Sequence, residues 1–430
     1  MRSTPIASRP PDRASHPRRL SDAGRITAAR GLRSFAYGLL AVLLGVALSA
    51  AGLSPAAIGG IITLSLAGDF VGTYLIGILA DRWGRRRTLV ALALLMAATG
   101  AVFGLTRFYP VLLVAAFFGT LGTTASETAP FLPIEQAMLA QIGAAERRTT
   151  LFARYNLVAS FAGALGALAA GLPDLLTRVG LPVDTGIRLM FGVYAGLALG
   201  VALLAAGLSP AVEATGSAPA TAKRWRLVPA LGPSRSIVLK LSALFSLDAL
   251  AGGLIVQSLM ALYFHLRFGV PLGPLAALFF GANTLTALSF LAVPTLARRF
   301  GLLNTMVFSH LPSNVLLALV AVMPTFPLAA GILLARQLLS QMDVPTRQAY
   351  TMALVTPEER TASASVTSLA RSAGSSTSPV FSGLLLQGPA LALGLPFIIA
   401  GALKAAQDLA LWGIFRRVRI EEAPGKREDT

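Results

Sequence analysis

Three acidic residues stand in or beside long apolar stretches of this 430-residue chain. Asp69 lies in IGGIITLSLAGDFVGTYLI, Glu127 follows VAAFFGTLGTTAS, and Asp248 lies in KLSALFSLDALAGG. A charge at the centre of a bilayer costs at least about 2.5–3.5 kcal/mol, so each such group needs a partner or a function. A carboxyl group that binds and releases a proton as its surroundings change can couple protons to transport. We therefore predict proton coupling at Asp69, Glu127 or Asp248, with a static pair to an arginine or to hydroxyl groups as the alternative.

The second half of the chain carries cations inside apolar stretches. Arg336 and Arg371 could hold an anionic substrate, and salt bridges between helices are the alternative use. Lys404 and Asp408 are spaced i,i+4, which predicts a structural ion pair on one helix face. Other side chains suited to a substrate cavity could equally belong to an aromatic belt or to packing between helices; they are Tyr74, Tyr155, Tyr263, Gln257 and Asn283.

The composition argues against other kinds of chemistry. The chain has no cysteine, which excludes disulfides and cysteine-based metal sites. Its three histidines lie far apart without the spacing of metal ligands. No phosphate-binding GxxxxGK[ST] loop and no nucleophile–base constellation is visible. We expect no enzyme activity, no metal and no cofactor, with a proton gradient as the energy source.

These residues must be held by membrane-spanning helices. The chain is 55% hydrophobic with a mean hydropathy of +0.70. Apolar stretches of about 20 residues recur, each long enough to span about 30 Å of hydrocarbon. In lipid, only helices and closed β-barrels satisfy all backbone hydrogen-bonding groups. The alternating pattern of barrel strands is missing from this sequence, so the stretches are predicted to be helices. We predict an all-α membrane protein with twelve spans, at 33–52, 57–79, 88–106, 109–131, 150–172, 187–208, 237–263, 273–296, 303–323, 326–345, 362–386 and 391–415.

The distribution of positive charge predicts the orientation. Of the 36 Lys and Arg residues, 28 fall on the side of both termini and four on the opposite side. By the positive-inside rule both termini are cytoplasmic. The net charge of +17 is therefore a topology signal, and we expect no nucleic-acid partner. Residues 1–32 are interpreted as a disordered basic cytoplasmic tail, with a transit peptide as the alternative.

The two halves of the chain are repeats of each other. ILADRWGRRRT (78–88) aligns with TLARRFGLLNT (295–305), and PIEQAMLAQIGAAERRT (133–149) with PTRQAYTMALVTPEERT (345–361). Both overlays align loops that occupy the same position in each half: the loop between spans 2 and 3 with that between 8 and 9, and the loop between spans 4 and 5 with that between 10 and 11. This predicts two six-helix bundles in parallel pseudo-repeat with a site between them at mid-membrane. The predicted divisions are a first bundle at 33–208, a cytoplasmic linker at 209–236, a second bundle at 237–416 and a tail at 417–430.

The stretch GILADRWGRRR resembles the Gly-x-Leu-x-Asp-Arg-x-Gly-Arg-Arg/Lys signature between helices 2 and 3 of the major facilitator superfamily. The resemblance covers residues 33 to 416 and implies transport by alternating access. It also implies that Asp81 caps the helix that begins near Thr361 and so latches the cytoplasmic side. The arginines are expected at phospholipid headgroups or paired with Glu135 or Glu146. The predicted gating motif comprises Gly77, Asp81, Arg82, Gly84, Arg85 and Arg86.

The repeated loops supply a second set of expected gate or loop residues. Asp343 and Arg347, spaced i,i+4, are interpreted as the counterpart of Glu135, and Arg148 and Arg360 occupy equivalent positions of the overlay.

Two features common in the family are missing here. VAAFFGTLGTTASET (114–128) has no arginine followed by Gln-Gly, and NLVASFAGALGALAAG (156–171) has no Gly-Pro pair of the antiporter signature. We interpret the chain as a monomeric secondary transporter of the inner membrane that exports a small organic molecule by proton coupling. The alternatives are a uniporter or importer of an anionic metabolite, and a membrane sensor that does not transport.

Overall fold

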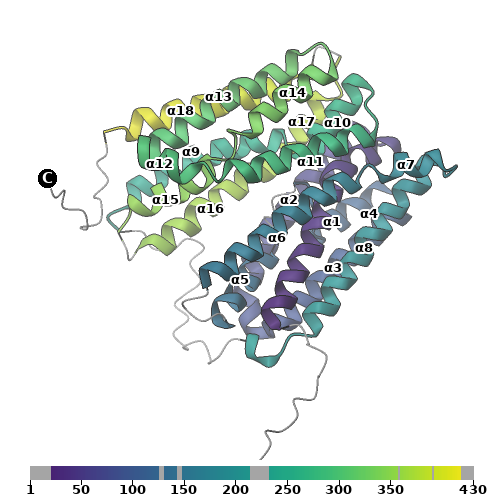
Figure 1. Ribbon diagram of the computed structural model, residues 1–430, viewed down its shortest axis with the longest axis horizontal. Helices are drawn as coiled ribbons and strands as arrows, with labels where there is room; N and C mark the ends of the chain where they lie inside the picture. Colours follow the sequence, from purple (N-terminus) through teal and green to yellow (C-terminus); the bar gives the residue numbers. More distant parts are fainter. Residues whose placement is uncertain are drawn as a thin grey trace, which may run out of the picture.

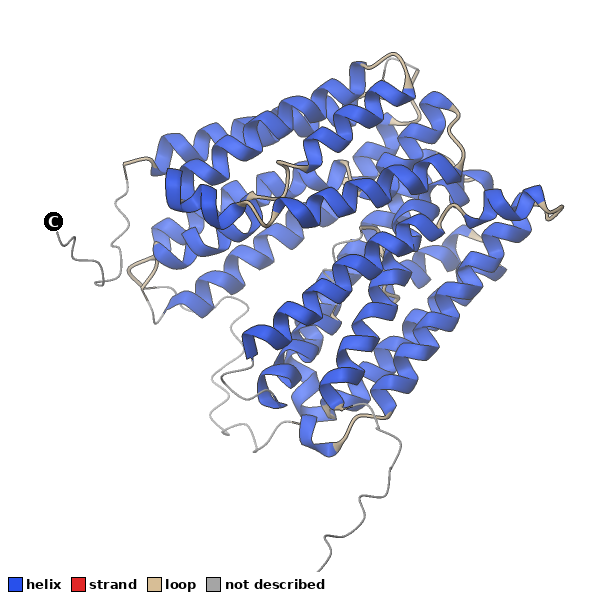
Figure 2. Cartoon of the chain, in the orientation of Figure 1, coloured by secondary structure: helices blue, strands red, loops and turns tan. Residues whose placement is uncertain are grey.

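The structure, a computed structural model, describes residues 21–124, 130–142, 148–213, 232–356, 359–389 and 392–417. Throughout this part of the chain the regular secondary structure is helical (Figure 2). Nine helical segments within it are long and apolar enough to cross a membrane. The predicted class, an all-α membrane protein, is confirmed.

The first half of the chain follows the predicted spans, with two of them interrupted. In the region predicted as 109–131, α4 ends at Phe118 and α5 begins only at Phe131, and in the region predicted as 150–172, α6 ends at Ala169 and α7 begins at Leu172. The helices of this half are α1 (Asp22–Ala50), α2 (Pro55–Trp83), α3 (Arg85–Leu105), α4 (Tyr109–Phe118), α5 (Phe131–Ile142), α6 (Arg148–Ala169), α7 (Leu172–Arg178) and α8 (Val183–Ala206), followed by the 3-10 turn η2 (Pro210–Val212).

The second half is more often interrupted, so the count of twelve crossings stays a prediction. Breaks fall inside four of its predicted spans, one of them at Pro379. Its helices are α9 (Arg235–Leu254), α10 (Gln257–Phe268), α11 (Leu272–Ser289), α12 (Val293–Phe300), α13 (Leu302–Val322), α14 (Phe326–Gln337), α15 (Asp343–Ala353), α16 (Arg360–Thr377), α17 (Pro379–Leu385) and α18 (Leu395–Phe415).

Backbone carbonyls freed by the break after α4 are satisfied by side chains. The Tyr194 hydroxyl donates to the carbonyl of Thr120. The carbonyl of Thr123 accepts from both the backbone N–H and the hydroxyl of Ser258, at 3.3 and 3.2 Å. Irregular backbone at membrane depth is tolerated only with such partners. Because Ser258 belongs to the second half, this break is also a contact between the halves.

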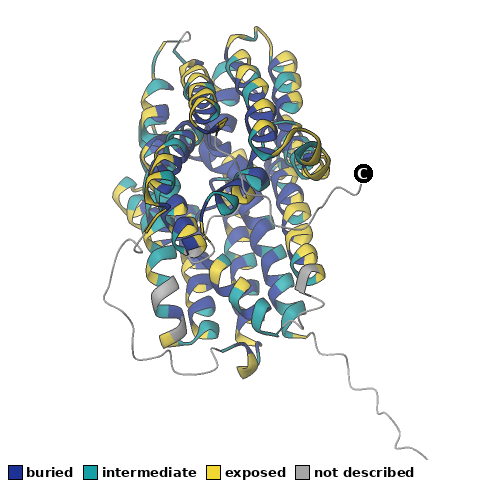
Figure 3. Cartoon of the chain, turned by 90° about the vertical axis from the view of Figure 1, so that its left-hand side faces the viewer, coloured by how far each residue is buried: buried dark blue, intermediate teal, exposed yellow. Residues whose placement is uncertain are grey.

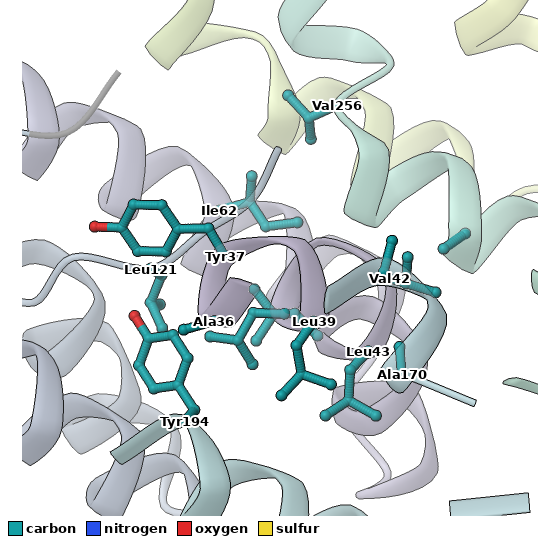
Figure 4. Packing of buried hydrophobic residues seen from close by; sticks show 14 of the residues in the cluster. Ala36, Tyr37, Leu39, Val42, Leu43, Ile62, Leu121, Ala170, Tyr194 and Val256 are labelled. Carbon is teal, nitrogen blue, oxygen red and sulfur yellow. The ribbon is translucent and has the colours of Figure 1, made fainter. Parts of the chain in front are cut away.

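The helices gather into two bundles that meet at one end and diverge at the other (Figure 1). At the diverging end lie the start of α1 and the end of α18, so the molecule opens toward the side of both described chain ends. The centre of the first bundle is α1, whose residues 36–48 are all buried. Side chains of α2 and α8 pack against those of α1, and Val256 of the second half lies nearby (Figure 4). The two-bundle fold expected from the repeat is confirmed.

Small residues bring the bundles together at the closed end. The Cβ of any residue replacing Gly59 on α2 would lie 2.6 Å from the carbonyl oxygen of Pro379 and 3.0 Å from the Cα of Gly383 on α17. Nearby, the backbone N–H of Val380 donates to the Thr63 hydroxyl at 2.9 Å. Contact this close between backbones requires glycine.

A carboxylate adds a polar contact at the same end. The Asp174 side chain on α7 accepts from the backbone N–H of Gly273 at 2.6 Å. Gly273 lies in the first turn of α11, so the acid of one bundle caps a helix N-terminus of the other. Hydrogen bonds and close backbone packing thus both hold this end shut.

The outer surfaces of the bundles are apolar, as lipid contact requires. Exposed residues lie largely on the outward faces of the helices (Figure 3). Large exposed hydrophobic residues include Leu105, Leu203, Leu291 and Phe308. Water-exposed helices would carry polar groups at such positions.

The beginning of the first helix differs from the prediction. We expected the helix at residue 33 and a tail before it, whereas α1 begins at Asp22 with Ser21 as its N-cap. Arg30 and Arg33, counted in the sequence as topology charges, are buried within this helix. The predicted start at residue 33 followed the change in hydropathy. Arg30 and Arg33 lower the hydropathy of the preceding stretch although both are buried in the helix, so the true start was missed.

Both described ends of the predicted linker are anchored by glutamates. Glu213 accepts from the backbone N–H groups of Arg85 and Arg86, at 2.7 and 3.2 Å, and so caps α3. Glu359 accepts from the backbone N–H of Gly232 and, at 3.0 Å, from that of Ser234. The domain limits themselves stay predictions.

Replacing Glu359 by alanine is expected to free the backbone at Gly232 and Ser234. Hydrogen bonds, first of all from Ser234, hold the pKa of Glu359 below its ordinary value. A carboxyl group with a lowered pKa stabilises the folded contact above its unfolded pKa, and this contribution is lost as pH falls through the folded pKa. Hydrogen exchange at pH 7 should show these two amides exchanging several-fold faster in Glu359→Ala. Unchanged exchange of these two amides in Glu359→Ala would contradict the anchor. Glu213→Ala is the control: it uncaps α3 and should leave the exchange of Gly232 and Ser234 unchanged.

Candidate functional site

A cavity of about 300 Å³ lies between the two bundles. Ser160 of α6 contributes to its wall from the first bundle, and Gln257, Asn283, Arg336 and Lys404 contribute from α10, α11, α14 and α18 of the second. Each bundle therefore provides part of one polar surface. This is the place where a parallel pseudo-repeat is expected to put a substrate.

A larger space of about 690 Å³ continues from this cavity. The two share Ser160 and Asn283 in their walls, and the larger one extends to Arg30 on α1 and Gln348 on α15. Those two residues lie toward the end where the bundles diverge. The central cavity thus opens toward the side of the chain ends and is closed on the other.

Of the two charged residues among the described lining of this cavity, Lys404 forms an ion pair and Arg336 does not. The Arg336 residue is 5% exposed, and its Nη1 donates to the Gln337 amide oxygen at 3.3 Å. Its Nε finds no hydrogen-bond partner in the described part of the chain. Arg336, Gln257 and Asn283 were predicted to line a cavity, and all three do so.

The other charges of the second bundle form an ion network around Asp248. Lys404 Nζ lies 2.5 Å from Asp248 Oδ1, and an Arg371 nitrogen lies 3.0 Å from Asp248 Oδ2. Arg347 lies 3.7 Å from the same oxygen and 2.6 Å from Asp343. Asp248, a predicted proton site, is therefore surrounded by cations. For Arg371 the geometry is that of the alternative, a salt bridge between helices.

One expectation for this bundle is wrong. Lys404 and Asp408 do not pair with each other, since Lys404 contacts α9 and Asp408 contacts α13. Asp343 and Arg347 form the expected i,i+4 pair, which is buried in the network on α15, and a gate role for them stays a prediction.

His310 is a polar contact that the sequence analysis missed. Its Nδ1 lies 3.0 Å from both carboxylate oxygens of Asp408, and the Asn314 amide donates to Asp408 at 2.8 Å. His310 and Asn314 are spaced i,i+4 within an apolar helix, and that spacing was the available signal. Within the described residues no three acidic or histidine side chains converge as metal ligands would.

The first bundle contains a fully buried ion pair. Two nitrogens of Arg33 each lie 2.7 Å from one oxygen of Glu135, and the Tyr155 hydroxyl donates to Glu135 at 2.6 Å. Arg30 stacks over the Tyr155 ring at 4.9 Å. Glu135 is thus an interior residue of α5, and its expected pairing with the motif arginines is wrong.

Asp69 has a different environment from the other acids. It lies on α2 with 8% exposure, and its Oδ1 has no hydrogen-bond partner in the described part of the chain. Tyr37 and Tyr194 are near enough to interact with it electrostatically. Glu127 lies outside the described residues.

The remaining tyrosines lie apart from the central cavity. Tyr155 is buried against Glu135, and the Tyr263 hydroxyl accepts from Arg267 at 2.8 Å. Tyr74, half-buried on α2, is not among the residues that line the described cavity. Packing between helices, the alternative for these residues, fits Tyr155 and Tyr263.

The glycines of the predicted gating motif and its repeat have matching backbone conformations. Gly84 and Gly301, paired in the overlay of the two halves, have φ of +96° and +80°. This region favours glycine, and each residue separates two consecutive helices. The tight turn predicted at Gly84 is confirmed.

The charged residues of the motif are described only in part. Arg82 is exposed, and Arg85 donates to the Gln141 side chain at 2.8 Å. Arg86 is half-buried beside Glu213. The helix α2 includes Gly77 and Asp81, but the surroundings of Gly77 and the side chains of Asp81 and Arg148 lie outside the described part. The latch at Asp81 stays a prediction.

Arg360 lies at the start of α16. It is exposed, and its Nε donates to the carbonyl of Met352 at 3.3 Å. That contact lies within the second bundle, and a gate role for Arg360 stays a prediction.

Comparison with known proteins agrees with this architecture. An uncharacterized membrane protein of Saccharomyces cerevisiae is 29% identical over 412 residues, covering 89% of this chain and 92% of the relative. The arabinose-proton symporter of Bacillus subtilis is 34% identical over 101 residues, or 23% of this chain and 22% of the symporter. The structure of the nucleoside transporter NupG superposes with a TM-score of 0.71 at 13% identity, covering 92% of this chain and 99% of that one. The sequence pattern of the Major Facilitator Superfamily matches residues 26–379, most of the chain. This chain therefore belongs to the Major Facilitator Superfamily and has the fold of its transporters.

Proposed function

We propose that the protein exports a small organic molecule in exchange for protons, by alternating access through the central cavity. The observation that carries this proposal is a polar cavity between two bundles, closed at one end and open at the other. Such a geometry is one of the two states of a carrier that rocks about a fixed site. We further propose an inner-membrane location, cytoplasmic termini and action as a monomer, with lipid and substrate as the partners.

Asp69 is the proton site that the geometry favours. Asp248 is balanced by three cations, whereas Asp69 has tyrosines near it, Tyr37 from α1 and Tyr194 from α8. An ionised carboxylate buried without a cation is costly in a membrane. We therefore expect Asp69 to hold a proton in the present conformation and to release it in another. A proton-coupled relative, the arabinose-proton symporter, supports the coupling by analogy only.

Labelling of a single introduced cysteine tests this step without knowledge of the substrate. The natural chain has no cysteine, and Asn156, exposed in the larger cavity, is a suitable reporter position. If a protonated Asp69 stabilises the present state, labelling of Asn156→Cys should increase as pH falls from 8 to 5.5, after correction for thiol ionisation. Asp69→Asn, which mimics the protonated acid, should keep labelling high at every pH.

The control is a carboxylate away from the cavity. Asp184, half-exposed and paired with Arg107 and Arg188, should leave the pH profile unchanged when replaced by asparagine. A profile that persists in Asp69→Asn would remove this residue from the coupling. A parent chain whose labelling never responds to pH would favour a uniporter.

A further inference from the structure

We propose that the central cavity binds an organic anion, with Arg336 and Lys404 as its charged contacts. This proposal rests on the proposed function, in which the cavity is the transport site. It names the substrate class that the polar groups of the wall select.

Among the described residues, Arg336 has no counter-ion within ion-pair distance. Asp248 and Asp343, the acids that interact with it electrostatically, are already paired with Lys404, Arg371 and Arg347. The Gln337 oxygen that Arg336 contacts also accepts from the Ser340 hydroxyl at 2.6 Å. A guanidinium group is a donor at every nitrogen and stays charged when buried. Its missing partner must therefore be an acceptor, and an anion meets that need best.

The neutral groups of the wall point to the same chemistry. Gln257 Nε2 and Asn283 Nδ2 are buried donors without partners in the described part of the chain, and both belong to this cavity. No Asp or Glu is found among the described residues that line it. Buried polar groups are normally hydrogen-bonded, so several orphan donors around one space indicate a ligand rich in acceptors.

Lys404 connects the cavity to the ion network. It lines the cavity and at the same time lies 2.5 Å from Asp248. An anion bound beside Lys404 would compete with Asp248 for the positive charge of Lys404. Asp248 also contacts Arg371 of α16. Binding of the anion would therefore change the ion pairs of α16, a helix that packs against α2 of the other bundle.

The size of the space indicates an organic molecule rather than a bare inorganic ion. A volume of about 300 Å³ is at the lower limit for small-molecule sites. Apolar residues such as Met260 and Phe290 line it beside the donors. A carboxylate, sulfonate or phosphate group on a small carbon skeleton has this combination of properties, since guanidinium groups pair with all three.

Charged thiol reagents test the sign of the site in the otherwise cysteine-free chain. Asn283→Cys is exposed to methanethiosulfonates that carry either a sulfonate or a trimethylammonium group. After normalisation to a free thiol, we expect the sulfonate reagent to react about tenfold faster, because two cations attract it in a partly desolvated space. The preference should fall close to one in Arg336→Gln and persist in Arg336→Lys.

The controls separate this inference from the proposed function. Arg298→Gln, an exposed arginine of α12, should keep the preference. Equal rates of the two reagents in Asn283→Cys with Arg336 intact, or a faster reaction of the trimethylammonium reagent, would overturn the anion site. The proposal of an open carrier cavity would then still stand. If neither reagent reached the thiol of Asn283→Cys, the open cavity itself, and both proposals with it, would be contradicted.

Protection by size-matched compounds then identifies the acid group. Benzoate, phenylphosphonate and benzenesulfonate are compared with benzyltrimethylammonium for slowing the reaction of Asn283→Cys with neutral N-ethylmaleimide. Protection by one or more of the anions, lost in Arg336→Gln, supports the proposal. Protection by the cation alone contradicts it.

Discussion

Replacing Glu135 by alanine is expected to lower the free energy of unfolding by about 3–5 kcal/mol, the usual cost of removing one partner of a buried ion pair. The side chain of Arg33 is 0% exposed, and both of its hydrogen-bonding nitrogens in this pair face Glu135 at 2.7 Å. Without the carboxylate, the guanidinium would lose both of these bonds and retain its stacking on Phe131, whose ring centroid is 4.3 Å away. Thermal or denaturant unfolding of the detergent-solubilised protein measures the loss.

Two comparisons show whether the loss comes from the buried charge. The double variant Arg33→Met/Glu135→Leu removes both charges and should recover most of the stability, because apolar pairs often replace buried ion pairs at little cost. Asp184→Ala breaks an ion pair that is about half exposed, and such pairs contribute about 0–1 kcal/mol. If Glu135→Ala cost no more than Asp184→Ala, the proposed importance of the pair for stability would be wrong.

Valine at Gly59 is expected to prevent closure of the end where α2 meets α17. Its Cβ would lie 2.6 Å from the Pro379 carbonyl oxygen, and neither backbone can yield without separating the bundles. The equilibrium should shift away from the present conformation by a factor of about ten or more, since about 1.4 kcal/mol of steric cost is enough for tenfold. Labelling of Asn156→Cys should decrease accordingly.

A glycine with more space around it among the described residues provides the matched control. At Gly72, also on α2, an added Cβ would lie 3.8 Å from the Pro130 ring, its nearest described neighbour. Gly72→Val should therefore leave labelling of Asn156→Cys near its original rate. Equal decreases in both variants would indicate a general defect of α2, and no decrease in Gly59→Val would show that this contact does not control the opening.

The fold could be read from the sequence because membrane solvation acts on local segments. Each apolar stretch had to become helical on its own, so the spans were found without knowledge of their neighbours. The repeat added the two-bundle arrangement, and the Gly84/Gly301 pair of the overlay has the same backbone conformation in both halves. Helix breaks were less visible, because partners distant in sequence, such as Tyr194 and Ser258, satisfy the freed carbonyls.

The candidate site could be read only in part. Arg336, Gln257 and Asn283 were recognised as polar residues in apolar surroundings, and they line the cavity. The sequence could not say which buried charges neutralise one another. Lys404 and Asp408 had ideal spacing on one helix, yet each pairs with a different neighbouring helix.

The sequence by itself therefore determined the membrane class, the all-helical architecture, the repeat and the family of this protein. Only the tertiary structure decided that Arg33 pairs with Glu135, that Asp69 Oδ1 finds no hydrogen-bond partner in the described part of the chain, and that Arg336 lines the cavity. The physical reason is the range of the interactions. Hydrophobic length acts within one segment, whereas an ion pair depends on the rotation and depth of two helices that are distant in the chain. Arg33 and Glu135 are 102 positions apart.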